Sequence, residues 1–282
     1  MTLFECVPNL SEGRDASIIR ACADAAAAAG ARVLHRTSDP VHNRSVLTMA
    51  GSASDLLAAS VALAGIAVER IDLRVHAGVH PRIGALDVLP FVPLGSASMA
   101  QAVRLARDSA RAIWERYRVP SFFYGEAASV PERRDLAVVR RGGFEGLERR
   151  FARPGWHPDV GDVPRHPSAG AVAVGARSLL VAFNVDLSTG DLTVAKGIAA
   201  AVRERGGGLR TLKALGFRLS AGVVQVSLNV TDYHATPLYR VAELIRALAA
   251  ERGVAVLRCE LIGALPYDAV EATARYYLGV LP

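Results

Sequence analysis

The strongest constraint on the fold is an internal duplication, because one order of strands and helices occurs twice along the 282 residues. In the first half, apolar alternation, helix caps and glycine stops predict strand, helix, strand, strand, helix and strand at residues 4–10, 15–29, 32–37, 45–50, 52–70 and 86–92. The second half repeats this order at residues 179–187, 191–205, 213–219, 223–230, 236–252 and 255–262. A β-α-β-β-α-β order that occurs twice predicts two ferredoxin-like units.

Segments outside the repeat extend this scheme. We expect helices at residues 98–118 and 268–278, a short strand at 122–124, and a loop rich in Pro, Gly, His and Asp at 154–170. The predicted fold class is therefore α+β, with two ferredoxin-like (βαββαβ) α/β sandwich subdomains and extra helices. The expected subdomains are residues 1–178 and 179–282.

Charge and composition restrict the partners of the chain. The net charge is +6, but the basic residues are spread out and aromatic residues make up 6%, a pattern that does not favour nucleic-acid binding. The longest apolar stretches, residues 56–68 and 179–185, are too short or too interrupted to cross a bilayer, and no signal-peptide pattern follows the start. We expect a cytoplasmic protein that acts on small molecules, with no nucleic-acid or membrane partner. The charge is more typical of a solvated, arginine-rich surface, although it also suits a polyanionic small molecule.

The three cysteines are Cys6, Cys22 and Cys259. They lie far apart, in apolar surroundings and without Cys-x-x-Cys spacing. This pattern argues against a disulfide framework and a zinc site, and it predicts buried, inert thiols. No metal is expected.

The segment from His80 to Val88 brings together more potentially catalytic or binding residues than any other stretch of the sequence. His80 is followed by Pro81, Arg82 and Gly84, and then by an apolar strand that carries Asp87. An imidazole titrates near neutral pH and Pro81 fixes the backbone beside it, so the segment predicts a rigid corner that moves a proton next to an anionic substrate. Asp87 either orients the imidazole or makes a contact at the start of the strand.

Four further observations concern binding. A metal site at His76 and His80 is disfavoured, because the intervening residues and Pro81 argue against the helix that would place both rings on one face. Arg44 lies between two predicted strands, where it suits either a carboxylate or an exposed turn. Glu126 is a candidate catalytic acid, a partner of a substrate amine or a helix-start residue. Residues 161–170 combine prolines with terminal glycines, which allow the backbone to approach a flat ligand.

Taken together, these motifs resemble the glutamate formimidoyltransferase family, which includes the transferase half of formimidoyltransferase-cyclodeaminase. The resemblance begins with Glu-Cys-Val-Pro-Asn-Leu-Ser-Glu-Gly-Arg at residues 5–14. It continues through residues 43–46, 80–88, 124–128, 156–177, 182–185 and 260–263 and ends with the helix after Pro266, so that it covers nearly the whole chain.

The resemblance implies an enzyme that transfers the formimidoyl group of N-formimidoyl-L-glutamate to N5 of tetrahydrofolate, giving 5-formimidoyltetrahydrofolate and L-glutamate. This reaction belongs to histidine degradation and one-carbon metabolism, and tetrahydrofolate is a co-substrate. The resemblance also implies a homodimer, an active site between the two subdomains, and His80 as the catalytic acid/base. It places folate contacts on Gly161, Asp162, Val163, Pro164, Arg165, His166, Pro167, Ser168, Ala169 and Gly170.

The substrate-binding residues follow from side-chain chemistry. We expect Arg44 and Arg82 to hold the carboxylates of the glutamate, and Asn184 to orient it. Two alternatives stay open: a transferase that uses N-formylglutamate or a related one-carbon donor, and a non-catalytic ligand-sensing module, since the fold alone supports both.

Overall fold

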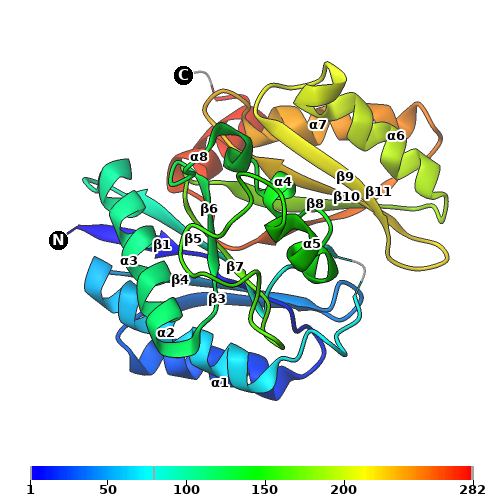
Figure 1. The fold of residues 1–282 in the computed structure, drawn as a ribbon. Helices are drawn as coiled ribbons and strands as arrows, with labels where there is room; N and C mark the ends of the chain where they lie inside the picture. The colour runs from blue at the N-terminus through cyan, green and yellow to red at the C-terminus, as the bar shows by residue number, and fades with distance from the viewer. Residues whose placement is uncertain (1, 79, 281–282) are drawn as a thin grey trace. The chain divides into compact units, whose positions relative to one another are not determined.

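The computed structural model describes residues 2–78 and 80–280, and the chain separates into two compact units, one ending at Arg177 and one beginning at Ser178 (Figure 1). Each unit has its own hydrophobic core. Each also combines a sheet with helices, so the predicted α+β class is confirmed. Among the described residues, no helix is both long and apolar enough to cross a membrane.

The first unit begins with the predicted order of elements. These are β1 (Leu3–Cys6), β2 (Asn9–Leu10), α1 (Ala16–Ala28), β3 (Arg32–Asp39), β4 (Arg44–Gly51), α2 (Ala53–Arg70) and β5 (Leu86–Leu94). Asp15 caps α1, and Ser52 with Asp55 forms a capping box on α2. The single strand predicted at residues 4–10 is instead split into β1 and β2, because Pro8 lies between them and has no N–H for the ladder.

The sheet of this unit extends beyond the repeat. After α3 (Met99–Tyr117) come β6 (Ser121–Gly125), the short helices α4 (Leu136–Arg140) and α5 (Leu147–Phe151), and β7 (Val172–Ala176). The strands run in the order β1-β4-β2-β5-β7-β6, with β3 beside β4. Helices α1, α2 and α3 pack on one face of this sheet, and α4 and α5 lie on the other side (Figure 1).

No sequence pattern predicts β7. It is parallel to both β5 and β6, and all of its residues are buried. A parallel strand covered on both faces has no polar alternation, so Val-Ala-Val-Gly-Ala gives no period-2 signal.

The second unit contains β8 (Val181–Leu187), α6 (Leu192–Val202), β9 (Leu212–Arg218), β10 (Val224–Val230), α7 (Leu238–Ala250), β11 (Val256–Ile262) and α8 (Tyr267–Leu278). Its strands are antiparallel, in the order β11-β8-β10-β9. Alternate residues of β8 and β10 form the core with α6 and α7. One expectation is wrong here: Cys259 on the edge strand β11 is exposed, whereas Cys6 and Cys22 are buried.

Candidate active site

Asp87 is positioned by an irregularity in the pairing of β2 with β5. Asn9 pairs with Val88 and Leu10 pairs with Leu86, so Asp87 is left without a partner in β2. A bulge of this kind redirects a side chain. The Asp87 carboxylate is 0% exposed, and its Oδ1 accepts a hydrogen bond from the backbone N–H of Ile83 at 2.8 Å.

Two guanidinium groups bind the other oxygen of Asp87. Arg44 Nη1 donates to Oδ2 at 2.8 Å, and Arg140 Nη2 donates to the same oxygen at 2.6 Å. The side chains of Arg44 and Arg140 are 10% and 12% exposed. Arg44 also donates through Nη2 to Asn9 Oδ1. We call Arg44, Asp87 and Arg140 the charge cluster.

The charge cluster is positive at neutral pH. Burial alone would raise the pKa of Asp87, but Arg140 and Arg44 lower it to about 2, so the carboxylate is ionised. Burial, together with Arg140, lowers the pKa of Arg44 to about 10, so this guanidinium stays protonated. Two cations therefore meet one anion in a nearly dry place, which leaves one positive charge in excess.

His80 lies beside the cluster and is half-buried. Its Nδ1 is 2.8 Å from the carbonyl oxygen of Pro81 and 3.4 Å from Nη1 of Arg44. The shorter contact requires a proton on Nδ1, so the geometry favours the tautomer with its lone pair on Nε2. Among the residues that the structure describes, no group is hydrogen-bonded to Nε2.

The protonation of His80 differs from the sequence-based expectation of titration near neutral pH. Burial lowers the pKa of His80, and the positive charges of Arg44 and Arg140 lower it further, to about 3. The carbonyl of Pro81 and the charge of Asp87 oppose this shift without reversing it. The imidazole is therefore a neutral base at physiological pH. Asp87 does not bond to the imidazole itself but to the arginine next to it.

Arg82 is bound by other protein groups. Its Nη1 and Nη2 donate to both carboxylate oxygens of Glu145, at 3.0 and 2.8 Å. Its Nε donates to Nδ1 of His76 at 3.1 Å, and Nε2 of His76 lies 3.1 Å from the carbonyl oxygen of Asn43. His76 is thus a structural link. In the described part of the chain, no group of three His, Cys, Asp or Glu side chains is placed to hold a metal ion.

The end of the 161–170 loop is fixed against the segment that follows His80. His166 and Gly170 close a tight turn through backbone hydrogen bonds of 2.7 and 3.1 Å. The carbonyl of Ala169 accepts from the N–H of Ala85 at 2.9 Å. A Cβ on Gly84 would lie 2.1 Å from the carbonyl oxygen of Ala171, so glycine is required for this close approach.

The middle of the loop is more open. Val163 is exposed, and Arg165 forms an ion pair with Glu148 at 2.7 Å while its guanidinium lies 4.2 Å from the ring centre of Phe144. Gly161 has a φ of +100°, and a Cβ there would lie 2.9 Å from the ring of Trp114. The loop is therefore held at both ends and reaches solvent between them.

Two sequence candidates lie elsewhere. Asn184 is on β8 of the second unit, where its Nδ2 donates to Oε2 of Glu260 at 3.2 Å. Glu126 follows β6, is exposed, and binds Arg134 through both oxygens at 2.6 and 2.5 Å. The structure therefore joins Arg44 with His80 and places Arg82 and Glu126 in other ion pairs.

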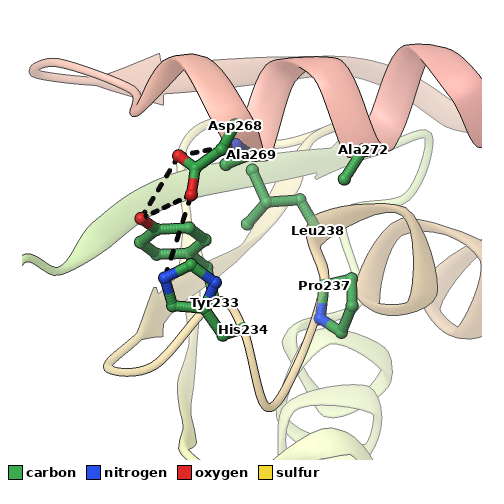
Figure 2. Close-up of a pocket in the computed structure, with 7 residues that line it drawn as sticks. All are labelled: Tyr233, His234, Pro237, Leu238, Asp268, Ala269 and Ala272. Atoms are coloured by element: carbon green, nitrogen blue, oxygen red, sulfur yellow. Dashed lines mark hydrogen bonds and ion pairs between the residues drawn. The ribbon is translucent and has the colours of Figure 1, made fainter.

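A hollow of about 190 Å³ in the second unit is a weaker candidate for chemistry (Figure 2). There Asp268 accepts from the hydroxyl of Tyr233 at 3.1 and 3.3 Å and lies 3.8 Å from Nε2 of His234. His234 and Asp268 are 72% and 55% exposed, so water screens their charges. The charge cluster of the first unit has no such screening.

Sequence reasoning missed Arg140. It belongs to the short helix α4, far from Asp87 in the chain, and in the sequence it appears as one of several Arg-Arg pairs. Its neighbour Arg141 is exposed. Nothing in the sequence pattern distinguishes Arg140, whose side chain is 12% exposed, from the exposed Arg141.

Comparisons with known proteins place both units in one family. Residues 3–177 match the model of the N-terminal subdomain of the formiminotransferase domain, and residues 182–280 match the model of the formiminotransferase domain. The chain is 43% identical to a glutamate formimidoyltransferase of Thermoplasma acidophilum and 41% identical to one of Streptococcus pyogenes serotype M1; each alignment covers 99% of this chain, and 93% and 94% of those proteins. It is also 37% identical to a formimidoyltransferase-cyclodeaminase of Rattus norvegicus, of which the alignment covers 52%. The chain belongs to the formiminotransferase domain family.

Proposed function

We propose that this protein is a glutamate formimidoyltransferase, which moves the formimidoyl group of N-formimidoyl-L-glutamate to N5 of tetrahydrofolate and releases L-glutamate. The observation that carries the proposal is the identity of 41–43% to two proteins of that name over 99% of the chain. The neutral base next to a buried positive cluster supports it from the side of chemistry.

His80 is the group that moves the proton. As N5 bonds to the formimidoyl carbon, Nε2 of His80 takes the proton that N5 loses. As the bond from that carbon to the glutamate nitrogen breaks, the imidazolium gives the proton to the departing nitrogen. The ring ends neutral, as it began, and such acid–base catalysis contributes roughly 10²–10⁴-fold in rate.

The charge cluster suits an anionic substrate. We assign the carboxylates of formimidoylglutamate to Arg44 and Arg82, and its orientation to Asn184. On Arg82 the substrate carboxylate takes the place of Glu145, whose side chain is 65% exposed. A carboxylate near Arg44 also weakens the repulsion between the cluster and an imidazolium. Substrate binding therefore raises the pKa of His80 toward the range in which it both accepts and donates a proton.

We assign folate contacts to the loop from Gly161 to Gly170. The support is its two fixed ends, beside the segment that follows His80, with an open middle between them. Loops anchored on a rigid scaffold commonly carry binding groups. A homodimer and a cytoplasmic location complete the proposal; size-exclusion chromatography with light scattering tests the dimer.

The test is turnover by the purified chain with tetrahydrofolate and formimidoylglutamate, followed through the formation of 5-formimidoyltetrahydrofolate and glutamate. The proposal expects both products in equal amounts. Turnover with N-formylglutamate alone would support the alternative donor. Binding of either donor without product would support a ligand-sensing module and overturn the proposal.

A further inference from the structure

Arg140 takes no part in the proposed reaction steps, but its contact with Asp87 indicates a role in the site. We propose that Arg140 is a positioning residue for His80, because it holds the Asp87 carboxylate in the orientation in which Asp87 binds Arg44 beside the imidazole. This inference rests on the proposed function, since it takes His80 as the acid/base.

The first support is the sharing of one oxygen. Arg140 and Arg44 donate to the same Oδ2 of Asp87, while Oδ1 is occupied by the N–H of Ile83. The carboxylate is fully buried, so its orientation is set by these protein groups and not by bulk water. Without Arg140, the carboxylate and Arg44 would form a simple pair that can rotate about the remaining contacts.

The second support is that the end of α4 is itself held in place. Arg150 is 8% exposed and donates through Nη1 to the carbonyls of Val139 and Arg141, at 2.6 and 2.8 Å. These carbonyls flank Arg140 on both sides, at the helix end where a cation is favourable. The guanidinium of Arg150 lies 3.9 Å from the ring centre of Trp156. The backbone of Arg140 is therefore fixed by its own buried support.

The third support is an unsatisfied donor. Nε of Arg140 is buried and has no hydrogen-bond partner within the described residues. An unpaired buried donor costs free energy. The fold tolerates this cost while keeping Nη2 on Asp87, so the ion pair with Asp87 determines the orientation of the guanidinium.

The charged and titratable groups that face His80 come from several elements. They are Arg44 on β4, Asp87 on β5, Arg140 on α4, and His42 in the β3–β4 turn, whose ring lies 6.1 Å from that of His80 and whose Nδ1 is 2.6 Å from Asp39. Removal of the Arg140 charge lifts one repulsion on the imidazolium and loosens Arg44. Both changes reach His80. The loss of charge is measured by the titration of His80, and the loss of positioning is measured by kcat, which an arginine that only stabilises the fold leaves unchanged.

The experiment is a pH titration of the ligand-free full chain labelled with ¹⁵N-histidine, followed by NMR, with His80→Gln used to assign the signal. Arg140→Gln is expected to raise the pKa of His80 by roughly one unit. Arg140→Lys, which keeps the charge, is expected to stay nearer to the wild-type value. Arg141→Gln, which removes one charge at the adjacent exposed position, is the matched control and is expected to leave the His80 signal unchanged.

Steady-state kinetics completes the test. Arg140→Gln is expected to lower kcat more than it changes KM, with partial recovery in Arg140→Lys. If Arg140→Gln matches Arg141→Gln in kcat, the inference is overturned, whether or not the His80 titration changes. Should Arg140→Gln fail to fold, Arg140→Met tests the same loss of charge with an apolar chain of similar length. The titration needs no substrate, so a failure of formimidoyl transfer is distinguished from a failure of the positioning role.

Discussion

Asp87 in the first unit and Asp186 in the second are both buried carboxylates, but their electrostatic surroundings differ. In the first unit, Asp87 binds two arginines that are 10% and 12% exposed. In the second unit, Asp186 accepts from the neutral amide of Gln225 at 2.8 Å and from Nε of Arg258, which is 63% exposed. The same order of strands and helices thus supports an excess buried charge in one unit and a solvated pair in the other. The shared topology therefore does not determine the charge cluster, which depends on the side chains at particular positions.

The largest expected effect is a difference in kcat between substitutions of His80 in the first unit and His234 in the second. His80→Gln is expected to lower kcat by at least ~10²-fold, because the base next to the charge cluster is lost. His234→Gln, in the exposed Tyr233–Asp268 group, is expected to leave kcat within about two-fold of wild type, since it removes only screened interactions. Stopped-time product assays measure both variants, and circular dichroism checks that both are folded. Near wild-type turnover of His80→Gln would remove His80 from the mechanism.

The next largest effect is on the free energy of unfolding, which we expect to fall more when Asp87 is substituted than when Asp186 is. Asp87→Asn leaves two buried guanidiniums without a counter-charge, and such a loss costs roughly 3–5 kcal/mol of unfolding free energy. Asp186→Asn is expected to cost less, because Arg258 is already in water. Both tryptophans, Trp114 and Trp156, lie in the first unit, so urea unfolding followed by fluorescence reports on that unit, while circular dichroism reports on the whole chain. Equal losses in the two variants would contradict the comparison.

The loss of stability at acid pH that His80 and Asp87 cause is also expected in the first unit. The folded pKa of His80 is about 3, below the ordinary value of 6.5, so the unfolded chain binds a proton at this residue between these pH values and the folded chain does not. Stability is therefore complete above pH 6.5 and falls with pH toward 3, by up to about 1.4 kcal/mol per pH unit. Asp87, with a pKa near 2 against 3.8, adds a loss between pH 4 and 2. His80→Gln should flatten the fluorescence-detected loss between pH 6.5 and 4; an unchanged slope would reject the shift.

Sequence patterns predicted the duplicated part of the fold well, for a physical reason. Strands such as β8 and β10 place their apolar residues on one face, so Val185 and Val226 alternate with polar neighbours. Caps such as Asp15 and Ser52 mark helix starts. The same logic fails for β7, where both faces are covered, and at Pro8, where one missing N–H divides a strand.

The site was predictable only in part. His80 and Arg44 stand out by residue type, and the structure brings them within 3.4 Å. Arg140 does not stand out, because the contact that defines it spans from α4 to a bulge in β5. The low pKa of His80 also depends on burial and on two arginines that lie close to it in space but far from it in the sequence. Residue type and local spacing do not encode either cause.

The smallest expected effect concerns a carboxylate of the first unit that lacks burial. Glu126 belongs to a motif of the family resemblance, yet it is 46% exposed and binds Arg134, which is 59% exposed. An exposed pair of this kind contributes at most about 1 kcal/mol, because water screens it and two long side chains must be ordered. Glu126→Gln is therefore expected to change unfolding free energy by less than that and kcat by less than about three-fold, with Glu132→Gln as an exposed control nearby. A fall in kcat approaching that of His80→Gln would mean that Glu126 leaves Arg134 to act on the substrate, and exposure would then be no argument against a role for a charged side chain of this unit in the reaction.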